Sequence, residues 1–168
     1  EIGKLAFKTR LVGPITGPNL DVTLESRDAA LPSGRLASLD FTLKANPAGK
    51  DAAGKTRMDV TADGRASGLA PKDAALAKAI GDSLTLTLRG QADTGGTLAA
   101  ERLTIETPTA KARFAGTLGA ETLRGKLGFS SENLRAFAEI ARAKLAGTAN
   151  LEIDLDGSPR EKRINATF

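Results

Sequence analysis

The feature that most constrains this chain is a strict alternation of apolar and polar residues, clearest in residues 84–90 (LTLTLRG). Leucine takes every second position, and threonine fills most of the positions between. Because successive side chains of a β-strand point to opposite faces, the leucines share one face and the threonines the other. The segment therefore predicts a long strand with one aliphatic and one polar face.

The same alternation recurs along most of the chain, which indicates a mainly β protein. Glycine and proline separate the alternating segments, and residues 46–56, rich in Ala, Gly and Lys, predict a loop. Besides residues 84–90, strands are predicted over 4–12, 20–25, 39–44, 58–63, 103–107, 110–118, 123–129, 149–157 and 164–168.

Two segments depart from the period of two and predict short helices. Residues 71–80 have Pro71 at a favoured first helical position. Residues 131–142 carry apolar side chains at helical spacing and begin at an N-cap serine, Ser130 or Ser131.

Each predicted helix precedes a clean strand, 84–90 in the first case and 151–157 (LEIDLDG) in the second. Residues 58–90 and 123–157 therefore align as an approximate internal repeat of strand, helix and strand. A repeat of this length predicts sheet modules laid end to end. Ordinary recurrence of a pattern in an all-β protein is the alternative.

Composition bears on what covers the aliphatic faces and on which chemistry is possible. The chain has six Phe and no Trp or Tyr, and only two short helices are available as a second layer. It also has no Cys and no His, which excludes disulfides, thiolate metal sites and a histidine base. Its 24 basic and 20 acidic residues are evenly spread, without the basic stripe of a nucleic-acid binder. We therefore expect no cofactor and no nucleic-acid partner.

Residues 49–56 (GKDAAGKT) satisfy the Walker A formula, with Gly49, Gly54, Lys55 and Thr56 at its fixed positions. A phosphate site needs a helix after this loop, whereas the sequence that follows alternates. We interpret the segment as a surface loop. A P-loop enzyme, in which Lys55 would be essential for nucleotide binding, is the least favoured alternative.

Two acidic motifs also have simpler explanations than catalysis. Residues 93–95 (DTG) match the triplet of aspartic proteases, but no second copy is in the chain, so a hairpin turn is predicted. The acids of residues 152–156 begin like a calcium loop, but Arg163 stands where a bidentate Glu is required. Nothing else pairs a nucleophile with a base, and we expect no enzyme.

No apolar run approaches the roughly 18 residues that span a bilayer, and the first residues do not resemble a signal peptide. The chain starts in mid-pattern, with EIGKLAFKTRLV. Residues 1–168 are therefore either a protein that is soluble as it stands or one internal segment of a longer protein, and the start in mid-pattern favours the segment.

Most of the chain, from about residue 20 onward, resembles the TamB family of translocation and assembly module proteins and the wider AsmA-like group. The similar unit consists of GTLAAERLTIETPTAKARFAGTL, the leucine-led helix at 131–142, and KLAGTANLEIDLDGSP. It includes glycine-ended strands (Gly90, Gly116 and Gly157) and a break at Thr107–Pro108.

The resemblance implies a curled, open multi-stranded sheet, a β-taco or groove with an apolar inside. Such proteins lie in the periplasm, held to the bacterial inner membrane by a helix that this segment lacks. Other parts of the full protein reach an outer-membrane barrel partner of the BamA-like type (TamA). The implied roles are phospholipid transport between the two membranes and outer-membrane protein assembly.

Reasoning from the residues supports the same role. Two short helices leave much of the aliphatic face uncovered, and acyl chains could cover it with a gain of about 0.8 kcal/mol for each buried CH₂. Which side of each strand turns inward depends on register. Two alternatives remain: a scaffold that offers its sheet edge to client strands, and a plain structural β-sandwich or barrel. The expected lining residues are Leu84, Leu86, Leu88, Leu103, Ile105, Phe114, Leu118, Leu127, Leu151, Ile153 and Leu155.

Overall fold

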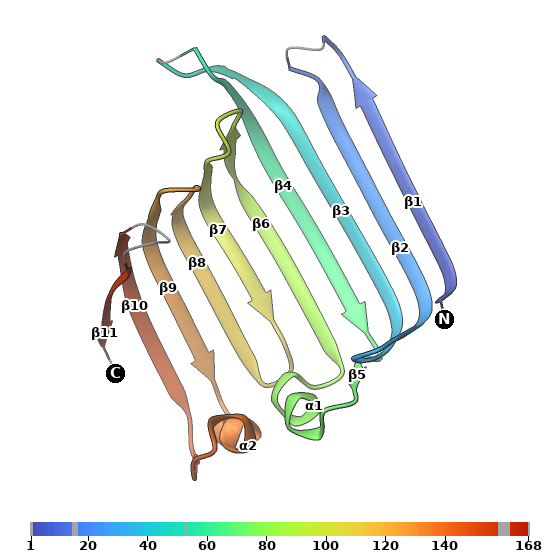
Figure 1. Cartoon of the computed structure of the whole chain (residues 1–168), viewed down its shortest axis with the longest axis vertical. Helices are drawn as coiled ribbons and strands as arrows, with labels where there is room; N and C mark the ends of the chain where they lie inside the picture. The colour runs from blue at the N-terminus through green and yellow to red at the C-terminus, as the bar shows by residue number, and fades with distance from the viewer. Residues whose placement is uncertain (1, 15–16, 53, 158–161, 168) are drawn as a thin grey trace.

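The chain forms one open antiparallel sheet with short helices at one end (Figure 1). The computed structural model describes residues 2–14, 17–52, 54–157 and 162–167. The strands are β1 (Ile2–Val12), β2 (Asn19–Leu31), β3 (Gly34–Lys50), β4 (Thr56–Ser67), β5 (Ala70–Pro71), β6 (Ser83–Asp93), β7 (Leu98–Glu106), β8 (Ala110–Leu118), β9 (Leu123–Ser131), β10 (Ala149–Gly157) and β11 (Lys162–Thr167). The helical segments are α1 (Ala74–Ile80), the 3₁₀ turn η1 (Leu134–Phe137) and α2 (Ala138–Ala141).

Neighbouring strands in the sheet are also neighbours in the chain. The order is β1-β2-β3-β4-β6-β7-β8-β9-β10-β11, and β5 pairs with β3 beside this path. The connections from β4 to β6 and from β9 to β10 contain the helical segments, which therefore lie at the same end of the sheet (Figure 1). Both predicted repeats fold as strand, helix and neighbouring strand, although the repeat itself stays a prediction.

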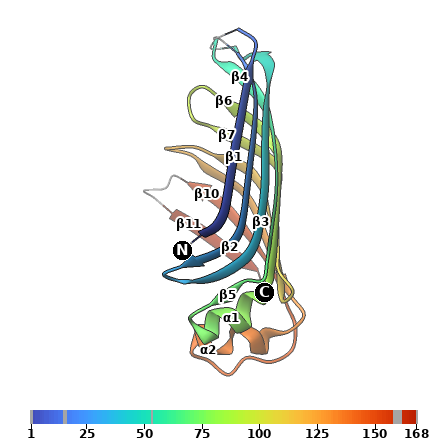
Figure 2. The same ribbon diagram turned by 90° about the vertical axis from the view of Figure 1, so that its right-hand side faces the viewer.

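The sheet is curved, and its helices lie on the concave side (Figure 2). This confirms the predicted open, curled, mainly β fold. No second sheet packs on it in the described ranges, and its outermost strands, β1 and β11, do not pair with each other. The alternative of a plain β-sandwich or closed barrel is therefore wrong.

A line of small residues crosses β6 to β9 in register and marks a crease in the sheet. Gly90 pairs with Ala100, Ala100 with Gly116, and Gly116 with Gly125. A Cβ atom added to Gly116 would lie 2.1 Å from the carbonyl oxygen of Arg124, so only glycine permits this backbone approach.

Register shifts in β6–β7 and β7–β8 interrupt the ladder beside the same crease. Bulges bend a strand and increase its twist, and we attribute the curl of this half of the sheet to them and to the glycines. Gly90 and Gly116 lie inside β6 and β8, so the prediction that they end strands is wrong.

The first helix starts later than predicted. Its N-cap is Asp73, whose Oδ1 accepts a hydrogen bond from the Leu76 amide at 2.9 Å. Pro71 instead belongs to β5, opposite Gly34 of β3. Because Asp73 can cap the first turn and proline cannot, the helix begins at Ala74.

The second helix is also shorter than predicted over 131–142, with one 3₁₀ turn followed by four α-helical residues. Ser131 is the last residue of β9, and its Oγ accepts a hydrogen bond from the Asn133 amide at 3.2 Å. Arg142 adopts a left-handed conformation, φ 52°, and ends the segment. Neither piece is long enough to cover the sheet.

The loop predicted over 46–56 is mostly strand. β3 continues to Lys50 and β4 begins at Thr56, with Pro47 opposite Met58. Pairing with β4 supplies backbone hydrogen bonds that outweigh the weak strand preference of Ala, Gly and Lys.

Candidate functional site

One continuous apolar face is the candidate site, and the strand register defines it. Residues paired across an antiparallel ladder lie on the same face. One row contains Leu88, Leu103, Phe114, Leu127 and Ile153, each opposite the next on the neighbouring strand. The row alongside contains Leu86, Ile105, Ala112, Phe129 and Leu151.

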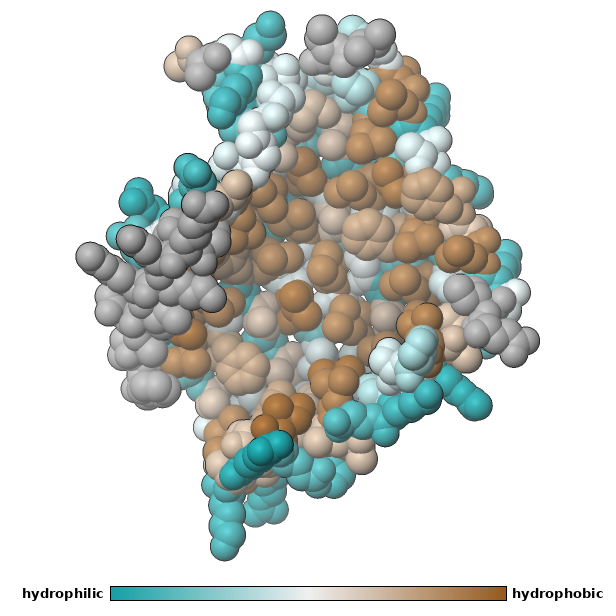
Figure 3. Space-filling view, in the orientation of Figure 1, coloured by the Kyte–Doolittle hydropathy of each residue, from teal (hydrophilic) through white to brown (hydrophobic). Residues whose placement is uncertain are grey.

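The same register places all eleven predicted lining residues on this face, which is the concave one (Figure 3). They are Leu84, Leu86, Leu88, Leu103, Ile105, Phe114, Leu118, Leu127, Leu151, Ile153 and Leu155. The prediction missed the continuation over the first strands. Alternation alone could have found these residues: Leu5, Phe7, Leu11, Leu20, Val22, Leu24, Leu39, Phe41 and Leu43.

The apolar side chains of this face are only partly buried. Phe114 is 7% exposed, and the other ten predicted lining residues are half-buried by their neighbours in the sheet. Among the described side chains, no large one is below 2% exposure. The molecule therefore lacks a sealed interior in its described part, and apolar side chains gather on the concave face.

The opposite, convex face is polar and carries cross-strand ion pairs. Arg27 contacts Asp40 at 2.7 Å, and Lys126 contacts Glu152 at 2.9 Å. Hydrogen bonding to Asp40 raises the pKa of Arg27, and the carboxylate of Glu152, with that of Asp154, raises the pKa of Lys126.

The acids that mimic a calcium loop belong to this same convex ladder. Glu152 and Asp154 lie near Lys126, and Asp156 contacts Arg124 at 3.0 Å. In the described part of the chain, no three His, Cys, Asp or Glu residues are grouped to hold a metal ion.

The helical segments form one rim of the concave face and are joined to the sheet by specific contacts. Phe129 of β9 packs edge-on against Phe137, with ring centroids 5.9 Å apart. Lys78 of α1 forms an ion pair with Glu139 of α2. Thr109 donates a hydrogen bond to the carbonyl oxygen of Ala79. These contacts join the helical segments to this end of the sheet.

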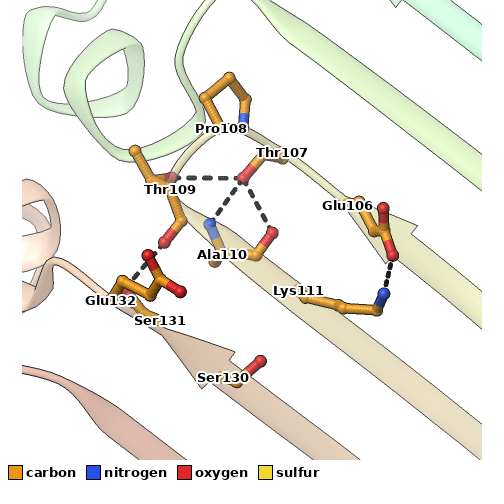
Figure 4. Close-up of a pocket in the computed structure, with 9 residues that line it drawn as sticks. All are labelled: Glu106, Thr107, Pro108, Thr109, Ala110, Lys111, Ser130, Ser131 and Glu132. Carbon is orange, nitrogen blue, oxygen red and sulfur yellow. Dashed lines mark hydrogen bonds and ion pairs between the residues drawn. The ribbon is translucent and has the colours of Figure 1, made fainter.

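A pocket of about 340 Å³ lies at this joint, between the β7–β8 turn and the end of β9 (Figure 4). Its polar groups bind one another: Ser131 Oγ donates to the Thr109 carbonyl at 2.8 Å, and Lys111 pairs with Glu106. No buried side-chain nitrogen or oxygen among the described residues lacks a hydrogen-bond partner. The buried polar side chains of the pocket are therefore already paired within the protein.

The two remaining motifs occupy turns. Residues 49–56 run from the end of β3 at Lys50 to the start of β4 at Thr56, and a strand that begins at Thr56 cannot provide the helix N-terminus of a phosphate site. Asp93 Oδ1 accepts hydrogen bonds from the amides of Gly95 at 2.7 Å and Thr97 at 3.0 Å. These bonds, that of Thr97 above all, lower the pKa of Asp93. Its carboxylate stabilises a turn, as the sequence predicts.

Within the described ranges, no helix has both the length and the apolar character needed to pass through a bilayer. No protein-family model, curated protein or solved structure matches the chain. The functional argument therefore depends on the geometry of the concave face.

Proposed function

We propose that this chain is a periplasmic groove segment that shields phospholipid acyl chains in transport between the inner and outer bacterial membranes. The resemblance to the TamB family suggests the same role, with an inner-membrane anchor and a BamA-like barrel partner (TamA) engaged by other parts of a longer protein. The observation that carries the proposal is the continuous apolar face, over which no second layer lies in the described part of the chain.

An apolar face of this extent requires an apolar occupant. Soluble monomers rarely expose contiguous apolar patches above a few hundred Å². Each acyl CH₂ transferred from water to this face gains up to about 0.8 kcal/mol. Aliphatic side chains such as Leu88, Leu103 and Leu127 offer no directional bonds, so an acyl chain can bind at many positions along the rows. Headgroups would stay in water at the rim.

The proposal is tested by placing charge on the concave face. Leu86→Asp with Ile153→Asp puts two carboxylates among the aliphatic rows, where a lipid tail cannot solvate them. The matched control is Thr61→Asp with Asn150→Asp on the convex face, where Thr61 lies opposite Lys44 and Arg89.

The original chain and both variants are purified from the bacterial periplasm, and bound phospholipid is measured by native mass spectrometry and solvent extraction. We expect lipid with the original chain and with the control, and at least about a tenfold loss with the concave pair. Circular dichroism should report intact strands in all three. Absence of phospholipid from the original chain, or equal lipid in both variants, would contradict the proposal.

A second candidate function is a scaffold for outer-membrane protein assembly by β-augmentation. The edge of β1 favours it, because among the described residues this strand pairs only with β2. Photocrosslinks from client peptides should then map to β1. Crosslinks confined to the concave rows would argue against the scaffold.

A further inference from the structure

The two helical connections meet across strands that lie between them. The first, which holds α1, leads into β6, and the second, which holds η1 and α2, follows β9. In the sheet, β7 and β8 separate β6 from β9. α1 nevertheless contacts η1 and α2, and Lys78 pairs with Glu139, 61 positions further along the chain. The helical segments α1, η1 and α2 therefore form a strap from β6 to β9 at this end of the sheet (Figure 1).

The β7–β8 turn joins this strap to the sheet from both sides. Thr109 donates its hydroxyl to the carbonyl oxygen of Ala79, a buried residue of α1. The carbonyl oxygen of Thr109 accepts a hydrogen bond from Ser131 Oγ of β9 at 2.8 Å. A Cβ atom added to Gly81 would lie 2.9 Å from Pro108 Cγ, so the end of α1 packs closely on the turn. The contacts thus run without a break from α1 through the turn to β9.

The four strands that the strap spans also carry the crease. Gly90, Ala100, Gly116 and Gly125 cross them in register, and the ladder shifts beside this line in β6–β7 and β7–β8. Glycine offers no side chain to pack, and a bulge interrupts the ladder, so strands with both are held less firmly than regular ones. A contact across the ends of these strands can therefore influence how strongly this part of the sheet curls.

The strap itself is held by exposed contacts. The side chains of Lys78 and Glu139 are 61% and 52% exposed. Leu76 of α1 and Ile140 of α2 are exposed as well. An ion pair in water contributes little to stability, and salt screens it further. The strands below are held by continuous backbone ladders. Opening of the strap therefore costs less free energy than separation of the strands.

We infer that the helical strap is a latch that retains lipid, an inference that rests on the proposed function. Closed, it holds β6 to β9 curled around the acyl chains; open, it lets these strands flatten so that a lipid can leave. Phe137 links the strap to the lipid face, because its ring packs on Phe129 with centroids 5.9 Å apart. Phe129 belongs to the concave row that contains Leu86 and Ile105. Movement of η1 away from the sheet would thus uncover the concave face.

The inference is tested by locking the strap. Lys78→Cys with Glu139→Cys removes the ion pair, and a short bifunctional thiosulfonate then ties the two positions until a reductant is added. The chain has no cysteine of its own. Both forms are loaded with fluorescent phosphatidylethanolamine, and its transfer to phosphatidylcholine vesicles is timed. We expect transfer to be at least about tenfold slower from the tied form and to recover on reduction.

The matched control is Arg124→Cys with Asp156→Cys, which replaces an exposed ion pair between the neighbouring strands β9 and β10. Tying this pair should leave the transfer rate unchanged, because the ladder already holds the two strands together. Equal rates from the tied and the reduced strap would overturn the latch while leaving lipid binding intact. Absence of phospholipid from every form would instead contradict the proposed function, and the latch with it.

The curl is also measured without lipid. Nitroxide labels at Thr85→Cys of β6 and Ser130→Cys of β9 lie three ladder steps apart on the convex face, about 14 Å in a flat sheet. Lys78→Glu, which repels Glu139, should lengthen and broaden this distance in electron paramagnetic resonance and speed lipid transfer about two- to fivefold. Lys78→Glu with Glu139→Lys should restore both values. Distances that do not differ among the three proteins would overturn the latch, whatever their lipid content.

Discussion

The two faces of this sheet come from the same strands but differ in how complete they are. On the convex face, cross-strand pairs such as Lys126 with Glu152 satisfy charges within the molecule. On the concave face, side chains such as Leu88 lie among apolar neighbours of the sheet and remain half-buried. Strand alternation thus creates both faces, but only on the convex face are the side chains paired within the chain. The concave face, whose apolar side chains stay partly exposed, is the one on which we expect a ligand.

The largest effect on the difference between the two faces is expected from a substitution that disturbs the curl of the sheet. Gly116→Val would force a Cβ atom into the Arg124 carbonyl oxygen and should cost about 3 kcal/mol of unfolding free energy, measured by urea denaturation. The control is Gly128→Ala on β9, where an added Cβ meets no atom within 4 Å. Similar losses for the two variants would show that the crease has no special requirement for glycine.

The next largest effect is expected at Ser131, where the helical segments are joined to the sheet. Ser131 is 4% exposed, donates to the Thr109 carbonyl oxygen and accepts from the Asn133 amide. Ser131→Ala should therefore destabilise the chain by about 1.5 kcal/mol. Ser130→Ala, one residue away on the convex face, should have little effect on the urea midpoint. Equal effects of the two substitutions on the urea midpoint would show that the hydrogen bonds of Ser131 add nothing specific to the stability of the fold.

A smaller effect is expected within the concave face itself. Leu88→Ala should cost about 1 kcal/mol, below the 2–5 kcal/mol typical of a sealed core, because the side chain is already half in water. Thr87→Ala, its convex neighbour, should change stability by less than about 0.5 kcal/mol. A loss of about 4 kcal/mol for Leu88→Ala in lipid-free protein would indicate that this face is covered.

The smallest effect concerns Asp93 in the β6–β7 turn, away from the middle of both faces. Its pKa is lowered in the folded chain, so the ionised carboxylate stabilises the turn above its usual pKa. That contribution is lost as the pH falls from about 4 through the lowered value. Amide exchange of Gly95 and Thr97 should then quicken. In Asp93→Asn, acid should not cause this change, and pH-independent protection in the original chain would contradict the account.

Much of this arrangement could be predicted because a period of two defines faces directly. Alternation in residues 84–90 and 151–157 predicted one aliphatic side for each strand, with Leu86 on the first and Ile153 on the second, without any knowledge of strand order. Few aromatic residues and two short helices predicted that the face would stay open. Neither prediction needed a long-range contact.

The rest depended on contacts that local patterns do not contain. Gly90 and Gly116 resemble strand ends in the sequence, and only their close approach to the next backbone explains them as a crease. Pro71 resembles a helix start until its pairing with Gly34 is known.

The central claim, that acyl chains occupy the concave face, is tested most directly at two adjacent residues of β9. Leu127 lies on the concave face and Lys126 on the convex one. Benzoylphenylalanine is placed at either position in living bacteria, irradiated, and the protein is searched for phospholipid adducts by mass spectrometry. The account predicts adducts from position 127 and none from position 126. Adducts from both positions alike, or from neither, would contradict it.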